Sequence, residues 1–142
     1  MVTPRYLLDT NIVKEPLKQK PNQHVLHYFQ QYQNVLAIAS PVWHVLWFGC
    51  YRLPPSKRRS AIEAYLHNAV ARTMPILPYD AKAAAWYAIE RARLTTIGQP
   101  TPFADGQIAA VAAVNNLTLV TNNITDYAKF QGLQIENWFI PI

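Results

Sequence analysis

Short apolar segments that alternate with helical segments are the feature that most constrains the fold of this chain. Residues 6–8, 35–39, 74–77 and 117–120 are short and apolar, and helix caps or amphipathic stretches lie between them. Such alternation predicts an α/β fold with a mainly parallel sheet. At 142 residues the chain has the length of one domain. We therefore expect residues 1–142 to form one three-layer α/β/α sandwich with a sheet of four or five strands.

The composition narrows the class of protein and its partners. Hydrophobic residues make up 51% of the chain and charged residues 15%, which excludes a disordered chain. The formal net charge of +5 suits a polyanionic partner such as nucleic acid. The single cysteine, Cys50, permits no internal disulfide, and the sequence shows no membrane span and no signal-peptide architecture. We expect a cytoplasmic protein.

Three aspartates occupy places where a parallel sheet would bring them together. Asp9 follows the apolar run 6–8, Asp126 comes shortly after the run 117–120, and Asp105 opens an Ala-rich helix. Because the carboxyl ends of parallel strands lie on one edge of a sheet, we expect these carboxylates to converge there. Clustered carboxylates hold hard cations such as Mg²⁺ or Mn²⁺, which assist phosphodiester hydrolysis. The alternative is that each aspartate only caps a helix, which is what we expect of Asp80.

The expected helices carry two further features. Asn22, Ser40 and Ser56 have the residue type of helix N-caps. The helix that begins at Pro41 contains four large rings, which form either part of the core or an exposed interface: Trp43, Trp47, Phe48 and Tyr51. Residues 57–59 place three cations in the first turn of a helix, where the helix dipole disfavours them, so they serve an anionic partner or form a solvated face.

Taken in order, short motifs along the whole chain resemble the PIN-domain ribonucleases of the VapC family, the toxins of bacterial toxin–antitoxin modules. The matching residues include Leu7-Leu8-Asp9-Thr10-Asn11, Ser40-Pro41-Val42-Trp43-His44, Asp105 with Ile108-Ala109-Ala110, Leu119-Val120-Thr121, and Asp126-Tyr127. The resemblance implies a metal-dependent endoribonuclease that cleaves structured RNA: tRNA, including initiator tRNA, or ribosomal RNA. It also implies a VapB-type antitoxin and operator DNA that is bound only as a complex with the antitoxin.

The resemblance further implies the site residues. Four acids would surround one or two Mg²⁺ or Mn²⁺ ions: Asp9, Asp105, Asp126 and the residue after His44. Thr121 would lie beside the metal site, and Asn11 would brace the turn after Asp9. Four large rings on the aromatic helix exceed what one core stripe needs, and they predict a homodimer that binds an antitoxin peptide over an apolar groove.

The chain departs from the family at Val45, where the family has Glu. Val45 is either a substitution that disarms the enzyme, introduced deliberately or selected because an active toxin harms its host, or a natural divergence. We expect reduced activity in both cases.

We expect basic side chains to contact the phosphates of the nucleic acid. The candidates are Lys14, Arg52, Lys57, Arg58 and Arg59, with Lys18 and Lys20 as further candidates. The alternative function is a catalytically impaired binding module that acts through its antitoxin and operator DNA.

Overall fold

The computed structural model describes residues 3–141 and contains a five-stranded parallel sheet. The strand order is β3-β2-β1-β4-β5. The strands are β1 (Tyr6–Leu8), β2 (Leu36–Ala39), β3 (Ile76–Leu77), β4 (Thr118–Val120) and β5 (Ile135–Glu136). All residues of β1 and β2 are buried, as expected for parallel strands covered on both faces. The prediction of an α/β fold with a parallel sheet is confirmed.

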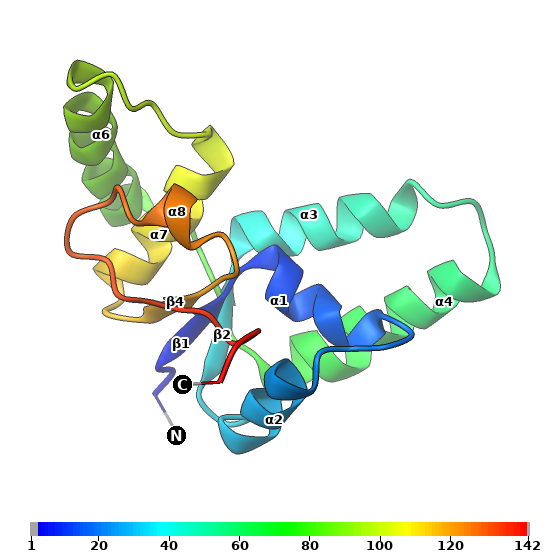
Figure 1. Ribbon diagram of the computed structural model, residues 1–142. Helices are drawn as coiled ribbons and strands as arrows, with labels where there is room; N and C mark the ends of the chain where they lie inside the picture. The colour runs from blue at the N-terminus through cyan, green and yellow to red at the C-terminus, as the bar shows by residue number, and fades with distance from the viewer. Residues whose placement is uncertain (1–2, 142) are drawn as a thin grey trace.

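Helices flank the sheet and connect its strands. They are α1 (Thr10–Lys14), the 3₁₀ helix η1 (Glu15–Leu17), α2 (Gln23–Gln31), α3 (Ser40–Tyr51), α4 (Lys57–Ala64), the π-helix η2 (Tyr65–Val70), α5 (Ala71–Thr73), α6 (Ala81–Thr96), α7 (Phe103–Val114) and α8 (Ile124–Tyr127). Figure 1 shows that α3 and α4 form an arm, in which the chain runs out along α3 and returns along α4. In the same view α6 and α7 lie on the other side of the molecule. Not one described helix has the length and apolar character needed to cross a bilayer.

Most of the predicted caps are present. The side chains of Asn22, Ser56 and Asp80 accept hydrogen bonds from backbone N–H groups in the first turns of α2, α4 and α6. Ser40 is the exception, because α3 begins one residue earlier than predicted and Ala39 is its N-cap. The Ser40 hydroxyl instead accepts a hydrogen bond from Tyr79 N at 3.2 Å. Strand β3 pairs with β2, so the residues that follow β3 lie beside the start of α3. This arrangement explains the hydrogen bond from Tyr79 N to Ser40.

The aromatic helix α3 divides its side chains between the core and the surface. Val42, Leu46 and Cys50 are buried and form its core face. Phe48 and Tyr51 are 57% and 59% exposed, and Trp43 and Trp47 are partly buried. The rings of α3 therefore do not all belong to the core, and the structure favours the exposed-surface interpretation for Phe48 and Tyr51.

Candidate active site

Asp9 lies at the carboxyl end of the central strand β1 and is only 6% exposed. Its Oδ1 accepts a hydrogen bond from Thr10 N, and its Oδ2 accepts one from Thr121 Oγ1, both at 2.8 Å. Thr121 reaches Asp9 because β4 runs parallel to β1, with Val120 paired to Leu8. Burial raises the pKa of Asp9, and the hydrogen bonds from Thr121 and Thr10 oppose this shift.

Asp105 lies in the first turn of α7, near enough to Asp9 and Asp126 to feel their charges. Its pKa is raised by burial and then by the negative charges of Asp9 and Asp126. Its Oδ1 accepts a hydrogen bond from Tyr127 Oη at 3.4 Å. Burial raises the pKa of Tyr127, and the neighbouring carboxylates raise it further, so this hydroxyl stays protonated and remains a donor. Asp9 and Asp126 are thus the charged neighbours that raise the pKa of Asp105.

Asp9 and Asp105 open into one pocket of about 450 Å³, and Asn11, Lys14 and Val45 also line it. The Oδ1 atom of Asn11 is buried and has no hydrogen-bond partner among the described residues. The Asn11 side-chain nitrogen donates to Asn122 Oδ1. An unpartnered oxygen beside two carboxylates is a donor set that suits a hard cation such as Mg²⁺ or Mn²⁺.

The three aspartates that we expected to bind a metal ion do not all line one pocket. Within residues 3–141, no group of three or more His, Cys, Asp or Glu side chains is placed to hold a metal ion. Asp126 is exposed at the surface in α8 and does not line the pocket with Asp9 and Asp105. The pocket therefore presents two carboxylates, and the negative charge of Asp126 raises the pKa of one of them, Asp105.

Val45 is the position at which the family resemblance implies a further acid. It is 42% exposed on α3 and lines the same pocket as Asp9 and Asp105. The four glutamates are engaged elsewhere: Glu15 with Lys18, Glu63 with Arg59, Glu90 with Arg93, and Glu136 with Trp138 Nε1. The prediction that no other acid replaces the missing one agrees with these contacts.

The predicted RNA-binding cations fall into two groups. Lys14 lines the acid pocket, and Lys14 and Arg58 line an adjoining pocket that Val45 also reaches. Arg59 instead bonds Glu63 and the Leu53 carbonyl within the α3–α4 arm. Arg52 lies over the ring of Phe48, and Lys57 is exposed at the start of α4.

Two further residues take part in the site in ways that local spacing does not predict. Lys18, a lesser candidate for phosphate binding, lines the acid pocket from the loop after η1, where it pairs with Glu15 at 2.8 Å. Tyr127 holds Asp105, and only its place directly after Asp126 in a family motif pointed to it. Lys18 reaches the pocket and Tyr127 reaches Asp105 because segments that are distant in the sequence pack together.

Comparison with known proteins gives consistent matches over nearly the whole chain. The family model of the PIN domain matches residues 6–131. The tRNA(fMet)-specific endonuclease VapC of Salmonella typhimurium is 29% identical over 135 residues, which are 94% of this chain and 98% of that protein. Ribonuclease VapC2 of Haemophilus influenzae is 31% identical with the same coverage. The crystal structure of DNA-bound VapBC from Salmonella typhimurium superposes with a TM-score of 0.83 at 29% identity, covering 95% of this chain and 98% of that one.

Proposed function

Because the chain belongs to the PIN-domain family and, within it, to the VapC ribonucleases, we propose that it is the toxin of a toxin–antitoxin module and cleaves structured RNA with Mg²⁺ or Mn²⁺. The observation that carries the proposal is the pocket in which Asp9 and Asp105 meet, with Thr121 bonded to Asp9. In such a pocket a bound divalent cation supplies an activated water and neutralises developing charge on the phosphate.

The protein's own side chains organise this pocket. Thr121 and the N–H of Thr10 hold the Asp9 carboxylate in one orientation. The Tyr127 hydroxyl holds Asp105, and Asn11 offers its unpartnered oxygen. Asp9, Asp105 and Asn11 are thus the residues that would bind the cation, while Asp126 adds negative charge from α8.

We propose that Val45 weakens the enzyme. An isopropyl group cannot coordinate a cation or orient water, and Val45 lines the pocket at the place of the missing acid. Loss of a residue that only supports a metal ligand costs about 10–100-fold in metal affinity or activity, and a missing ligand costs at least as much. This applies whether Val45 was introduced to disarm the toxin or arose by natural divergence.

The substrate we propose is a loop of structured RNA. A relative is named for cleavage of tRNA(fMet), which supports tRNA, including initiator tRNA, ahead of ribosomal RNA. Lys14 and Arg58 line the pockets around Val45, where they can contact phosphates on either side of the scissile bond. Single-stranded loops present an accessible backbone to such a site.

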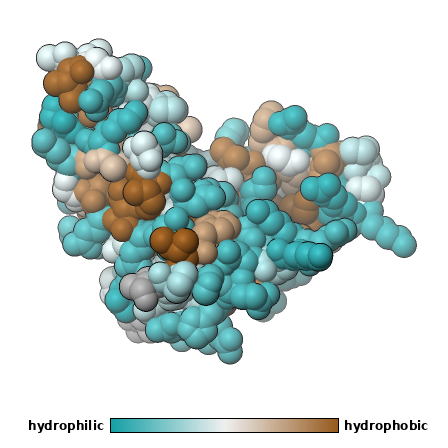
Figure 2. Space-filling view, in the orientation of Figure 1, coloured by the Kyte–Doolittle hydropathy of each residue, from teal (hydrophilic) through white to brown (hydrophobic). Residues whose placement is uncertain are grey.

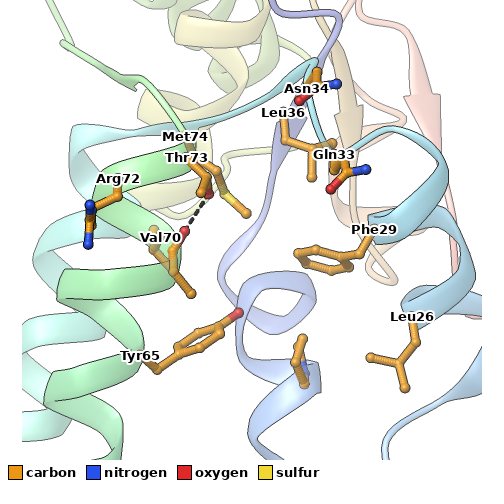
Figure 3. A pocket seen from close by; sticks show the side chains of 12 residues that line it. Leu26, Phe29, Gln33, Asn34, Leu36, Tyr65, Val70, Arg72, Thr73 and Met74 are labelled. Carbon is orange, nitrogen blue, oxygen red and sulfur yellow. Dashed lines mark hydrogen bonds between the residues drawn. The ribbon is translucent and has the colours of Figure 1, made fainter.

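We propose that a VapB-type antitoxin binds an apolar pocket away from the acids. This pocket has a volume of about 620 Å³ and lies between α2 and η2. Figure 3 shows Leu26 and Phe29 of α2 facing Tyr65 and Val70 of η2 across it. A DNA-bound VapBC complex is among the similar structures, which supports operator DNA as a partner of the toxin–antitoxin complex.

A homodimer is also proposed, with the face of α3 that carries Trp43, Trp47 and Tyr51 in its interface. Tyr51 is 59% exposed and stacks on the partly buried Trp47, which in turn contacts Trp43. Figure 2 shows hydrophobic side chains gathered over the α3–α4 arm. Light scattering at micromolar concentration should give twice the mass of 16.2 kDa. A monomeric mass would refute the homodimer and leave the site proposals unaffected.

The cytoplasmic location stays a prediction from the sequence.

The decisive experiment restores the acid at position 45. Val45→Glu should raise Mg²⁺- or Mn²⁺-dependent cleavage of tRNA at least about tenfold and restore growth arrest in a host cell. The double variant Val45→Glu with Asp9→Asn should not, because it lacks the buried carboxylate of β1. If the folded single variant cleaves no better than the original chain, Val45 is not the missing ligand position.

The alternative, an impaired binding module, is favoured by the absence of a three-acid group in residues 3–141. It predicts tight antitoxin binding with no RNA cleavage at any Mn²⁺ concentration. Cleavage that a chelator abolishes would exclude it.

A further inference from the structure

We propose that His44 and Phe48 on α3, together with its C-cap residue Arg52, form a platform on which an unpaired base of the RNA stacks beside the acid pocket. This stacking platform deepens the proposed ribonuclease function and rests on it for the identity of the bound strand as RNA.

The three side chains form one continuous row along α3. They are spaced four residues apart, so each lies one helical turn from the next. The rings of His44 and Phe48 are almost parallel, with 3° between their planes and 6.2 Å between their centroids. The Arg52 guanidinium carbon lies 5.5 Å from the Phe48 centroid. The row therefore offers parallel π surfaces that end in a cation.

The platform has no structural role in the core. The core face of α3 is formed by Val42, Leu46 and Cys50. This face lies on a different side of the helix from the row of His44, Phe48 and Arg52. Phe48 is 57% exposed, and His44 and Arg52 are exposed as well. By contrast, the partly buried Trp47 on the same helix is occupied by contacts with Trp43, Tyr51 and His67.

The position of the platform links it to the acid pocket. Val45 follows His44 directly and lines the pocket of Asp9 and Asp105. His44 and Val45 together line an adjoining pocket of about 330 Å³. Phe48 is three residues beyond Val45, and side chains three apart on a helix are neighbours. A base on Phe48 would thus belong to a nucleotide next to the one held at the acids.

The local charge favours RNA over a second copy of the chain. Lys14, Arg58 and Val45 line one pocket, and Arg52 lies at the end of the platform. In a two-fold interface this patch would face itself and bring like charges together. An RNA strand brings phosphates for the cations and bases for the rings, and single-stranded RNA is recognised by stacking on aromatic and guanidinium planes.

The test measures RNA binding without cleavage, in the presence of a chelator. A short fluorescein-labelled single-stranded RNA is titrated with the full chain, and anisotropy gives the Kd. Phe48→Ala should raise the Kd about tenfold, the size expected for one lost base–ring stack. Phe48→Tyr should restore binding. Ile89→Ala is the control, because it removes a similarly exposed apolar side chain from α6 and should leave the Kd unchanged.

Two further readouts separate stacking from other effects. A 2-aminopurine base in the RNA should be quenched on binding to the original chain and not on binding to Phe48→Ala. Binding of double-stranded RNA, whose bases are already stacked, should be the same for both. Equal loss of single- and double-stranded binding would overturn the platform, as would an unchanged Kd in Phe48→Ala.

A change of oligomeric state would also overturn the inference. If Phe48→Ala halves the mass seen by light scattering and loses RNA only as a consequence, the row is an interface between copies. The nuclease proposal is tested separately by cleavage in Val45→Glu. Failure of that cleavage with a retained Phe48 effect would refute the nuclease and support the platform as part of an RNA-binding surface.

Discussion

Gly106 follows Asp105 directly in α7, and the ring of Tyr87 occupies the space where a side chain would begin. A Cβ at Gly106 would lie 1.9 Å from Tyr87 Cζ. Tyr87 is only 1% exposed, and its hydroxyl lies 3.2 Å from Thr101 Oγ1. The ring therefore cannot move aside without losing buried contacts. The absence of a side chain at this residue lets α6 approach α7 beside the candidate active site.

At this residue we predict that Gly106→Ala destabilises the fold. The added methyl group should lower the free energy of unfolding by about 1–3 kcal/mol through overpacking, despite the better helix propensity of Ala. Urea denaturation at neutral pH measures the change. Gly49→Ala is the matched control, because Gly49 is exposed in α3 and a methyl group there would meet nothing within 4 Å, so it should stabilise by about 0.5–1 kcal/mol. Equal stability of the two variants would contradict the packing argument.

The buried carboxylate of Glu90, paired with the partly exposed Arg93 on the same helix, helps to join α6 to the segment after α8. Glu90 of α6 accepts two hydrogen bonds from Arg93 and one from Gln131 N, and Arg93 also donates to the Lys129 carbonyl. Lys129 and Gln131 lie just after α8, the helix that carries Asp126 and Tyr127. Phe130 between them is buried against Tyr87 and Tyr127. The ion pair thus anchors the chain that leaves α8.

This anchor predicts an acid-dependent loss of stability. The hydrogen bonds from Arg93 hold the pKa of Glu90 below its ordinary value of 4.5. A lowered folded pKa means that the stabilisation is fully present above about pH 4.5 and is lost as the pH falls through the folded pKa. Glu90→Gln should cost about 1.5–3 kcal/mol at pH 7, and the difference from the original chain should shrink in acid.

The control for this element is Glu63→Gln, which removes the acid from a more exposed pair. Glu63 has 37% of its side chain exposed and bonds Arg59 within the α3–α4 arm. Such a pair contributes about 0–1 kcal/mol. Urea unfolding of both variants at several pH values provides the comparison. A Glu90→Gln variant that behaves like Glu63→Gln would remove Glu90 as the anchor of α8.

On the scale of the whole molecule, the fold divides the cations behind the formal charge of +5 into two sets. Lys14 lines the acid pocket from α1, and Arg58 reaches the adjoining pocket from the α3–α4 arm. Neither of them forms an ion pair with a described acid, whereas Lys18, Arg59 and Arg93 each do. Lys14 and Arg58 are therefore the unpaired cations that we propose for phosphate contacts, whereas Arg59 and Arg93 are held in ion pairs and Lys18 both lines the acid pocket and pairs with Glu15.

We predict that Lys14→Ala weakens single-stranded RNA binding and reduces its salt dependence. Removing one phosphate contact should lower the slope of log K against log salt by about 0.7, because one fewer counterion equivalent is released. Anisotropy titrations across a range of KCl concentrations measure this slope. Lys82→Ala, an exposed cation on α6, should leave the slope unchanged. The same slope for Lys14→Ala and the original chain would exclude Lys14 from the RNA path.

Local sequence patterns predicted the order of strands and helices along the chain and the starts of α2, α4 and α6, whereas α7 and α8 begin two residues before the predicted Asp105 and Asp126. The apolar runs specify buried parallel strands, and Asn22, Ser56 and Asp80 cap helices because a cap bonds residues two or three positions away. The position of Asp9 at the end of β1 also follows from local pattern, whereas its place beside Thr121 comes from the parallel pairing of β1 with β4. These features depend on neighbours in the chain and on the handedness of parallel connections.

Only the tertiary structure decided which side chains share the pocket. It placed Val45 beside Asp9 and Asp105 and left Asp126 exposed in α8. The Ser40 hydroxyl accepts a hydrogen bond from Tyr79 N and does not cap α3, because β3 lies beside β2. Such outcomes depend on contacts between segments far apart in sequence, where the side-chain direction is set by the packing of whole elements, and no local periodicity encodes them.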